Sequence, residues 1–254
     1  MLPRPTTDGD VIQMAKLRPH VFVLSWPPVV ANVMTIIDSL GGTDYRKTVI
    51  DKSRLLGPDL KGWEYIGIAD ENYYGRQLEL ALRLFDGDVF ICITGDAQCT
   101  DWPGLVETCV QRFTDIPQIG VWSPEIENTG WNTARVSLGP TTDPDVQVVA
   151  QTDSIAWALR PSVVAQLRER NLFANNLGWG IDWVAITAAY TQGLVAVRDK
   201  KAFVHHPIGR SYSSDQALIQ LQTLFDELSG PERAMLCLLH RAMGIGHPFS
   251  YPIP

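Results

Sequence analysis

The segment "DVFICITGDAQ", residues 88–98, ends an apolar run on a carboxylate, Asp96. The run from Val89 to Ile93 is rich in β-branched side chains, which is typical of a buried strand. An Asp at the end of such a strand can bind a hard divalent cation, Mg²⁺ or Mn²⁺, that also contacts phosphate oxygens. Gln98 is a second candidate ligand. The alternative is that Asp96 is an ordinary turn former.

A second segment, "FVHHPIGRSY" at residues 203–212, brings two histidines, an arginine and a tyrosine together. Adjacent strand residues point to opposite faces, so at most one of His205 and His206 can face a given site. An imidazole beside a carboxylate suits Mn²⁺. Arg210 and Tyr212 follow, and a guanidinium is the expected partner of a diphosphate. The alternative is that one histidine packs in the core while the other is solvated.

A third segment, "GWGIDW" at residues 178–183, places Asp182 at the expected start of a helix. Any Asp is stabilised there by the helix dipole, so the position requires no function. The Trp- and Gly-rich flank, including Trp179 and Gly180, is typical of a sugar-stacking wall. A carboxylate beside an apolar ring can have a raised pKa and act as a general base.

The elements that must position these side chains alternate along the first half of the chain. Strands are predicted at 20–26, 47–53, 63–70 and 88–96, and helices at 29–40, 75–87 and from about 101–103. This rhythm indicates an α/β protein with a Rossmann-like mixed sheet flanked by helices. Ligands of such sheets bind outside the carboxyl ends of the strands. The polar residues that end the predicted strands are Ser25, Asp51, Asp70 and Asp96.

The second half of the chain is less regular. Residues 145–160 are predicted as extended structure that enters a helix at Pro161, and a helix follows the "GWGIDW" loop. Residues 194–212 are predicted as two strands and a loop. Apolar residues at 3–4 spacing then predict C-terminal helices.

The composition and net charge of the chain argue against several classes of function. The chain has 254 residues, 45% of them hydrophobic and 19% charged, which suits one large α/β domain or a domain with an appendage. A net charge of -7 without a Lys/Arg run argues against a nucleic-acid partner. No apolar run approaches the roughly 18 residues of a membrane span, and the N-terminus lacks the core of a signal peptide. Four cysteines without C-x-x-C spacing suit a reducing compartment. We expect a cytoplasmic protein. Peripheral attachment to the inner face of a membrane is compatible with this expectation.

The order of these motifs resembles the inverting glycosyltransferases of the GT-A fold, family-2 type. Five segments carry the resemblance, over roughly residues 20–212. They are "TVIDKS", "NYYGRQ", "ITGDAQ", "GWGIDW" and "VHHPIGRSY". The resemblance implies a GT-A-like domain at 1–212 and a C-terminal helical extension at 213–254. Within the domain, about 20–130 would bind the nucleotide-sugar and about 131–212 would bind the acceptor and carry the catalysis.

The resemblance also implies a role for individual residues. Asp51 would contact the nucleotide base, Asp96 would match the second, metal-binding Asp of a D-x-D element, and Asp182 would be the catalytic base. His206, followed by proline, would be the late metal-ligand histidine. The implied metal ligands are Asp96, Gln98, His206 and, less favoured, His205. The implied nucleotide-sugar-binding residues are Ser25, Asp51, Asn72, Gly75, Arg76, Thr94, Gly95, Asp96, Asp153, Trp179, Gly180, Arg210 and Tyr212.

The activity implied is a metal-assisted transfer of a hexosyl or N-acetylhexosaminyl group, with inversion, from a UDP- or GDP-sugar. The acceptor hydroxyl would belong to a glycan or a lipid-linked molecule, in glycan or polysaccharide biosynthesis with Mn²⁺ or Mg²⁺ as cofactor. Two positions depart from the pattern. Thr94 stands in place of the first Asp of D-x-D, and "VIDKS" replaces the more usual V-D-D-G-S.

Two other functions stay open at this stage. A nucleotidyltransferase also uses an α/β sheet with a metal, but "LSWPPVVAN" is neither Gly-rich nor basic after the first strand. A sugar- or nucleotide-binding protein without turnover is the other alternative, which Thr94 in place of the first Asp of D-x-D keeps open. The sequence does not specify the sugar, the acceptor or the oligomeric state.

Overall fold

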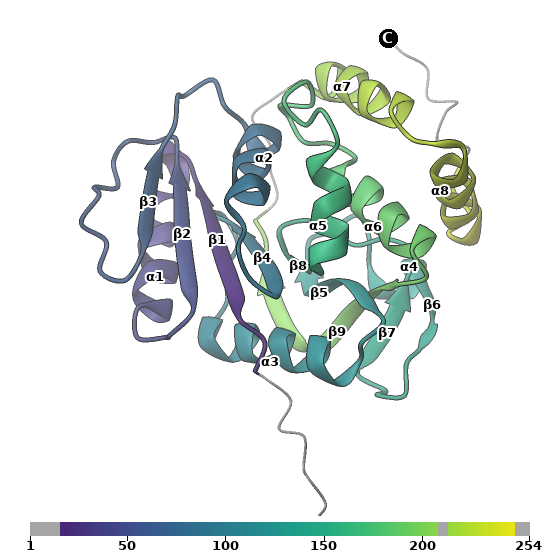
Figure 1. The fold of residues 1–254 in the computed structure, drawn as a ribbon, viewed down its shortest axis with the longest axis horizontal. Helices are drawn as coiled ribbons and strands as arrows, with labels where there is room; N and C mark the ends of the chain where they lie inside the picture. The colour runs from purple at the N-terminus through teal and green to yellow at the C-terminus, as the bar shows by residue number, and fades with distance from the viewer. Residues whose placement is uncertain (1–15, 208–212, 247–254) are drawn as a thin grey trace, which may run out of the picture.

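The computed structural model describes residues 16–207 and 213–246 and shows an α/β architecture (Figure 1). Its strands are β1 (Pro19–Ser25), β2 (Arg46–Asp51), β3 (Glu64–Gly67), β4 (Val89–Thr94), β5 (Ile119–Glu127), β6 (Ser137–Pro140), β7 (Val146–Val149), β8 (Ala156–Leu159) and β9 (Val195–His205). Its helices are α1 (Val30–Leu40), α2 (Tyr74–Leu84), α3 (Trp102–Asp115), α4 (Thr133–Val136), α5 (Pro161–Arg168), α6 (Ile181–Thr191), α7 (Ser214–Asp226) and α8 (Gly230–Ala242), with a 3₁₀ turn at η1 (Pro27–Val29).

The strands of the described residues form one nine-stranded mixed sheet in the order β3-β2-β1-β4-β8-β5-β9-β7-β6. Strands β1, β2, β3 and β4 are parallel to one another, and β8 runs antiparallel between β4 and β5. Ser25 pairs with Asp51, and Leu24 pairs with Thr94. The carboxyl ends of β1, β2 and β4 therefore lie side by side at one edge of the sheet.

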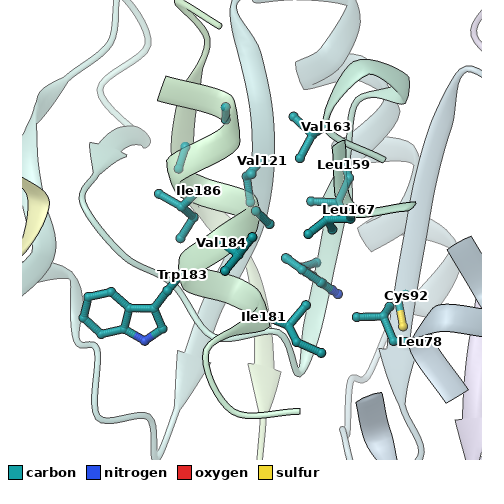
Figure 2. Close-up of a cluster of buried hydrophobic side chains, with 14 of the residues drawn as sticks. Leu78, Cys92, Val121, Leu159, Val163, Leu167, Ile181, Trp183, Val184 and Ile186 are labelled. Carbon is teal, nitrogen blue, oxygen red and sulfur yellow. The ribbon is translucent and has the colours of Figure 1, made fainter. Parts of the chain in front are cut away.

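Alternation along the strands builds a separate core on each face. Phe22 and Leu24 of β1 face the core under α2, α5 and α6, whereas Val21 and Val23 face the core under α1 and α3. Figure 2 shows part of the first core, where α6 lies against the sheet beside α5. The residues labelled there are Leu78, Cys92, Val121, Leu159, Val163, Leu167, Ile181, Trp183, Val184 and Ile186.

The predicted fold class is confirmed: a mixed sheet is flanked by helices and followed by C-terminal helices. The two strands predicted within 194–212 are wrong, because 195–205 forms one strand, β9. Residues 208–212 of the predicted loop lie outside the described residues. Asp199 pairs with Pro124 of β5, and the next pair joins Phe203 to Glu125. Three residues of β9 are thus accommodated in a bulge. The charged residues next to the bulge are held in the strand by Arg112, whose Nε donates to Asp199 Oδ2 at 2.6 Å.

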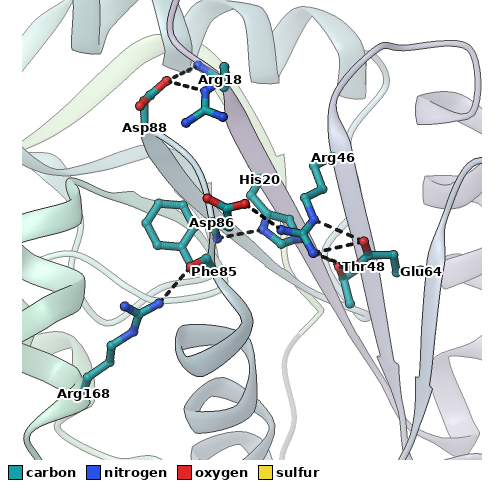
Figure 3. Close-up of polar contacts among 9 residues, drawn as sticks. All are labelled: Arg18, His20, Arg46, Thr48, Glu64, Phe85, Asp86, Asp88 and Arg168. Atoms are coloured by element: carbon teal, nitrogen blue, oxygen red, sulfur yellow. Dashed lines mark hydrogen bonds and ion pairs between the residues drawn. The ribbon is translucent and has the colours of Figure 1, made fainter.

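A buried histidine joins the amino ends of β1 and β2 to the loop after α2 (Figure 3). The backbone N–H of Asp86 donates to His20 Nδ1 at 3.3 Å, so the proton sits on Nε2, which lies 2.9 Å from Thr48 Oγ1. The Thr48 hydroxyl donates in turn to Glu64. Burial lowers the pKa of His20 to about 4, and the positive charge of Arg46 acts in the same direction.

This histidine predicts a pH-dependent stability. The folded state binds no proton at His20 until about pH 4, whereas the ordinary pKa is 6.5. The stabilisation is therefore fully present above pH 6.5 and is lost as the pH falls toward 4. The loss amounts to about 3 kcal/mol, because one pKa unit corresponds to roughly 1.4 kcal/mol.

We expect His20→Gln, which keeps a donor and an acceptor but cannot titrate, to lose less stability over this interval. Urea unfolding at several pH values measures the difference. Parallel losses in the two proteins would contradict the assignment.

Candidate active site

A cavity of about 930 Å³ opens at the carboxyl ends of the parallel strands, between these strands, α6 and α7. Several predicted site residues line it, and they come from four separate segments of the chain. They are Thr94, Asp96, Asp153, Trp179, Gly180, Asp182 and His206. The chain therefore brings the "TGD" strand end, the "GWGIDW" loop and the late histidine to one place.

Asp96 and His206 form a pair in this cavity. His206 Nε2 lies 3.2 Å from Asp96 Oδ2, and the Thr94 hydroxyl donates to Asp96 Oδ1 at 2.7 Å. The backbone N–H of Thr94 donates to the carbonyl of Ile155 at 2.8 Å, which fixes the strand end against the segment before β8. The hydrogen bond to Asp96 raises the pKa of His206 against the opposing effect of burial. Thr94, which stands where the resemblance implied the first Asp of D-x-D, thus orients the carboxylate of Asp96.

His205 and Gln98 lie on the other side of β9. They exchange two backbone hydrogen bonds of 2.9 Å, and both line a separate pocket of about 620 Å³ between α1, α3 and β9. The His205 ring is hydrogen-bonded to Glu127. The two adjacent histidines therefore face different pockets, as strand alternation requires.

Asp182 occupies the first turn of α6 and is half-buried in the cavity wall. The backbone N–H of Trp183 donates to Oδ1 at 2.9 Å, and Gln151 Nε2 donates to Oδ2 at 2.8 Å. A second carboxylate, Asp153, lines the same cavity and accepts a hydrogen bond from Thr129 at 3.1 Å. Neither carboxylate forms an ion pair with a Lys or Arg of the described residues.

The electrostatics of this wall favour protonated carboxylates. Burial raises the pKa of Asp182 well above its ordinary value, and the charge of Asp153 raises it further. The hydrogen bonds from Trp183 and Gln151 act in the opposite direction without cancelling the effect. Burial also raises the pKa of Asp153, against the hydrogen bond from Thr129. Asp182 is therefore a stronger base than an exposed aspartate.

The turn that presents Asp182 depends on glycines. Gly178 and Gly180 have φ values of 84° and 82°, in the left-handed region that favours glycine. The side chain of Asn175 fastens the turn: its amide donates to the Trp179 carbonyl at 2.7 Å, and its oxygen accepts from the Gly178 N–H at 3.2 Å. Gly75 allows this turn to pack against α2, because a Cβ there would lie 1.8 Å from the Asn175 carbonyl oxygen.

No protein-family model and no curated protein matches this chain. Solved structures do match it. The mannosyltransferase PcManGT from Pyrobaculum calidifontis, in complex with GDP-Man and Mn²⁺, has a TM-score of 0.63 and 16% identity, covering 93% of this chain and 72% of that chain. GalNAc-T7 with UDP, GalNAc and Mn²⁺ has a TM-score of 0.65 and 10% identity, and the match covers 92% of this chain and 52% of that chain. S. aureus TarS residues 1–349 have a TM-score of 0.61 and 11% identity, and the match covers 89% of this chain and 71% of that chain.

This chain has the GT-A fold. At these identities the similarity establishes the fold alone. The chain spans about half of the GalNAc-T7 chain.

Several predicted site residues do not line the cavity of about 930 Å³ but hold neighbouring parts of the chain in place. Asp51 is fully buried; its carboxylate accepts from the backbone N–H groups of Ser53 at 2.9 Å and Leu56 at 3.4 Å and from the Tyr65 hydroxyl at 3.3 Å. It therefore shapes the loop that follows β2. Ser25 is also fully buried.

Three more predicted residues have structural contacts. Asn72 accepts a hydrogen bond from Arg76 at 3.2 Å, and the Arg76 guanidinium stacks on Phe173 at 3.6 Å. A Cβ at Gly95 would lie 2.6 Å from Val29, so this glycine is required for packing. Arg210 and Tyr212 lie outside the described residues.

Part of the cavity wall is absent from the predicted set of site residues. Lys52, Asp70 and Tyr73 line it: Lys52 Nζ donates to the Asp70 carbonyl at 3.1 Å and lies 4.1 Å from the centre of the Tyr73 ring. Asp70 was named as a polar strand-end residue but was given no role in the site. Lys52 follows Asp51 directly and could have been found from the same strand end. The other missed lining residues include Trp26, Trp131, Leu218, Leu221 and Phe225.

A divalent cation can be held by the Asp96–His206 pair. No group of three or more His, Cys, Asp or Glu side chains in residues 16–207 and 213–246 is placed to bind a metal. Hard divalent cations, however, often use one or two protein ligands and complete their shell with phosphate oxygens and water. A carboxylate with an imidazole fits Mn²⁺ in this mode.

Because the pKa of Asp182 is raised, we expect the folded protein to become more stable when this carboxylate is replaced by a neutral side chain. A carboxyl whose pKa is raised by folding stabilises the fold most below its ordinary value of 3.8 and loses this contribution as the pH rises through the folded pKa. Asp182→Asn removes that loss. The substitution fits the site, because the buried Gln151 Oε1 lacks a partner and a flipped amide can accept from the new side chain.

We expect the melting temperature of Asp182→Asn to exceed that of the unaltered protein at neutral pH, and the gap to close toward pH 4. Calorimetry at several pH values measures both. A variant that is less stable at neutral pH would show that the carboxylate is charged at little cost.

Proposed function

We propose that this protein is a glycosyltransferase that moves a sugar from a nucleotide-sugar donor to an acceptor hydroxyl with inversion. One observation carries the proposal. The Asp96–His206 pair and the high-pKa carboxylate of Asp182 line the same cavity, at the carboxyl ends of the strands of a GT-A fold. The first suits a diphosphate with its cation, and the second suits a hydroxyl that must lose a proton.

The donor nucleotide belongs at the end of the cavity near β1 and β2. Trp26 and Tyr73 offer aromatic surface there, and Lys52 with Asp70 offers polar groups for a base or ribose. Asp51 acts on this end indirectly, through the loop that carries Lys52. GDP-Man and UDP occur with Mn²⁺ in two structures of similar fold, which supports a nucleotide-sugar as donor.

Asp96 and His206 would hold the divalent cation, with Thr94 orienting the carboxylate. When bound, such a cation neutralises the negative charge that grows on a leaving diphosphate. The absence of a second acid at position 94 leaves the pair less negative than a D-x-D element. We therefore expect metal binding to depend strongly on the nucleotide phosphates.

Asp182 would act as the general base. The acceptor oxygen forms a bond to C1 of the sugar while the bond from C1 to the diphosphate oxygen breaks, and the hydroxyl proton passes to the Asp182 carboxylate. Attack from the face opposite the leaving group inverts C1. Gln151 and the Trp183 N–H hold the carboxylate in place, and burial with the Asp153 charge keeps its pKa high enough to accept the proton.

The two adjacent histidines provide a matched test of the metal site. We expect His206→Ala to weaken Mn²⁺-dependent binding of UDP or GDP by at least about 10-fold, since it removes a ligand from the cavity. His205→Ala should change this affinity little, because His205 faces the other pocket. Isothermal titration with and without Mn²⁺ measures both. Equal effects, or the reverse order, would remove His206 from the site.

The base is tested by the substitution already described for stability. If Asp182 accepts the proton, Asp182→Asn should bind the nucleotide normally and lose transfer by roughly 10²–10⁴-fold, the usual range for general acid–base assistance. If Asp182 only stabilises the start of α6, Asn serves nearly as well and activity should stay near normal. Donor depletion and product formation are followed with UDP- and GDP-sugars. Near-normal transfer by Asp182→Asn would show that Asp182 is not the general base.

A further inference from the structure

The cavity has a second end that differs in chemistry from the nucleotide end. We call it the apolar end and define it by Trp131, Trp183, Leu218, Leu221 and Phe225, all of which line the cavity. The three residues of α7 carry no hydrogen-bonding group. The rings of Trp131 and Trp183 meet edge to face at 5.1 Å, and the ring of His240, which also lines the cavity, lies 4.0 Å from that of Trp183.

Helix α7 is fastened to the turn that presents Asp182. A Cβ at Gly180 would lie 3.1 Å from both Leu221 and Phe225, and the backbone N–H of Leu177 donates to Gln220 Oε1 at 2.8 Å. The apolar end is therefore continuous with the candidate base and built by the same loop. A group that presents a hydroxyl to Asp182 must place its neighbouring atoms against this surface.

The cavity has room for this second ligand. Its volume of about 930 Å³ lies near the top of the range for small-molecule sites, roughly 300–1,000 Å³. In the proposed function the donor occupies the end lined by Trp26, Lys52 and Asp70, which follow β1, β2 and β3, whereas Leu218, Leu221 and Phe225 come from α7. The apolar end is left for the acceptor.

We propose, on the basis of the proposed function, that the acceptor carries a compact apolar ring next to its reacting hydroxyl, and that Leu218, Leu221 and Phe225 select it. A purely polar saccharide would leave hydroxyl groups unpaired against α7, which is unfavourable. A long lipid alcohol would bring the chain to an anionic membrane surface, and a net charge of -7 opposes that approach. Flat aromatic walls favour a ring over a flexible chain.

Two neighbouring residues of α7 provide the test. Leu218 lines the cavity, whereas Ile219 is 47% exposed and does not line it. Leu218→Ser and Ile219→Ser make the same chemical change one position apart in the same helix. Binding is measured for the phenyl, methyl and octyl glycosides of glucose, galactose and mannose, with UDP or GDP and Mn²⁺ present and absent.

We expect at least one phenyl glycoside to bind about 10-fold or more tightly than its methyl counterpart. Leu218→Ser should abolish most of this preference, and Ile219→Ser should retain it. Equal affinity of phenyl and methyl glycosides would overturn the inference, as would equal effects of the two variants. Tighter binding of the octyl glycosides would overturn it in favour of a lipid acceptor.

The same titrations separate this inference from the proposed function. Nucleotide binding without any preference for phenyl glycosides would overturn the inference alone. A phenyl preference without binding of UDP or GDP would overturn the proposed function and leave the apolar end as a binding site. The preference of the unaltered protein decides the outcome even if Leu218→Ser fails to fold.

Discussion

The hydrogen bond from the Thr94 N–H to the Ile155 carbonyl joins the two halves of the site at the end of β4. The nitrogen lies 2.8 Å from that oxygen, and the single proton of the Thr94 hydroxyl is donated to Asp96 Oδ1 at 2.7 Å. Strand β4 thereby ends against the segment that carries Asp153, and Asp96 meets His206 in the same cavity. Together with the pairing of β4 and β8, this junction fixes the position of Asp96 relative to Asp153 and Asp182 of the other half. A side chain that departs from the expected D-x-D pattern thus has a definite structural role.

On the other wall of the cavity, the stability of the fold and the proposed role of Asp182 as a base make opposite demands. Asp182 is half-buried near a second carboxylate, and its charged form is disfavoured there. The surrounding loop tolerates this because it is over-determined: Asn175 holds the turn, Gly75 lets α2 approach it, and α7 covers it. Packing energy elsewhere keeps the carboxylate in an environment that an isolated turn would not maintain.

Local pattern predicted much of this molecule. Short apolar runs predicted β1, β2, β3 and β4, and the alternation of side chains along a strand predicted that His205 and His206 face different sides. Strand β5 was missed because its Gly120 and Pro124 resemble breaks. Gly120 is required there by packing, since a Cβ would lie 2.7 Å from Ala189. The bulge in β9 and the cavity-lining face of α7 arise from contacts between distant segments, which no local spacing encodes.

The same β9 bulge decides which imidazole meets Asp96. Three residues, Lys200 to Ala202, separate two successive pairs with β5, and the Arg112–Asp199 ion pair anchors the strand just before them. The bulge therefore sets the parity of every position that follows it. After the bulge, Phe203, Val204 and His205 pair with Glu125, Ile126 and Glu127, and this pairing holds His205 beside Glu127. The positions of the two histidines therefore depend on three residues of β9 that do not line the cavity themselves.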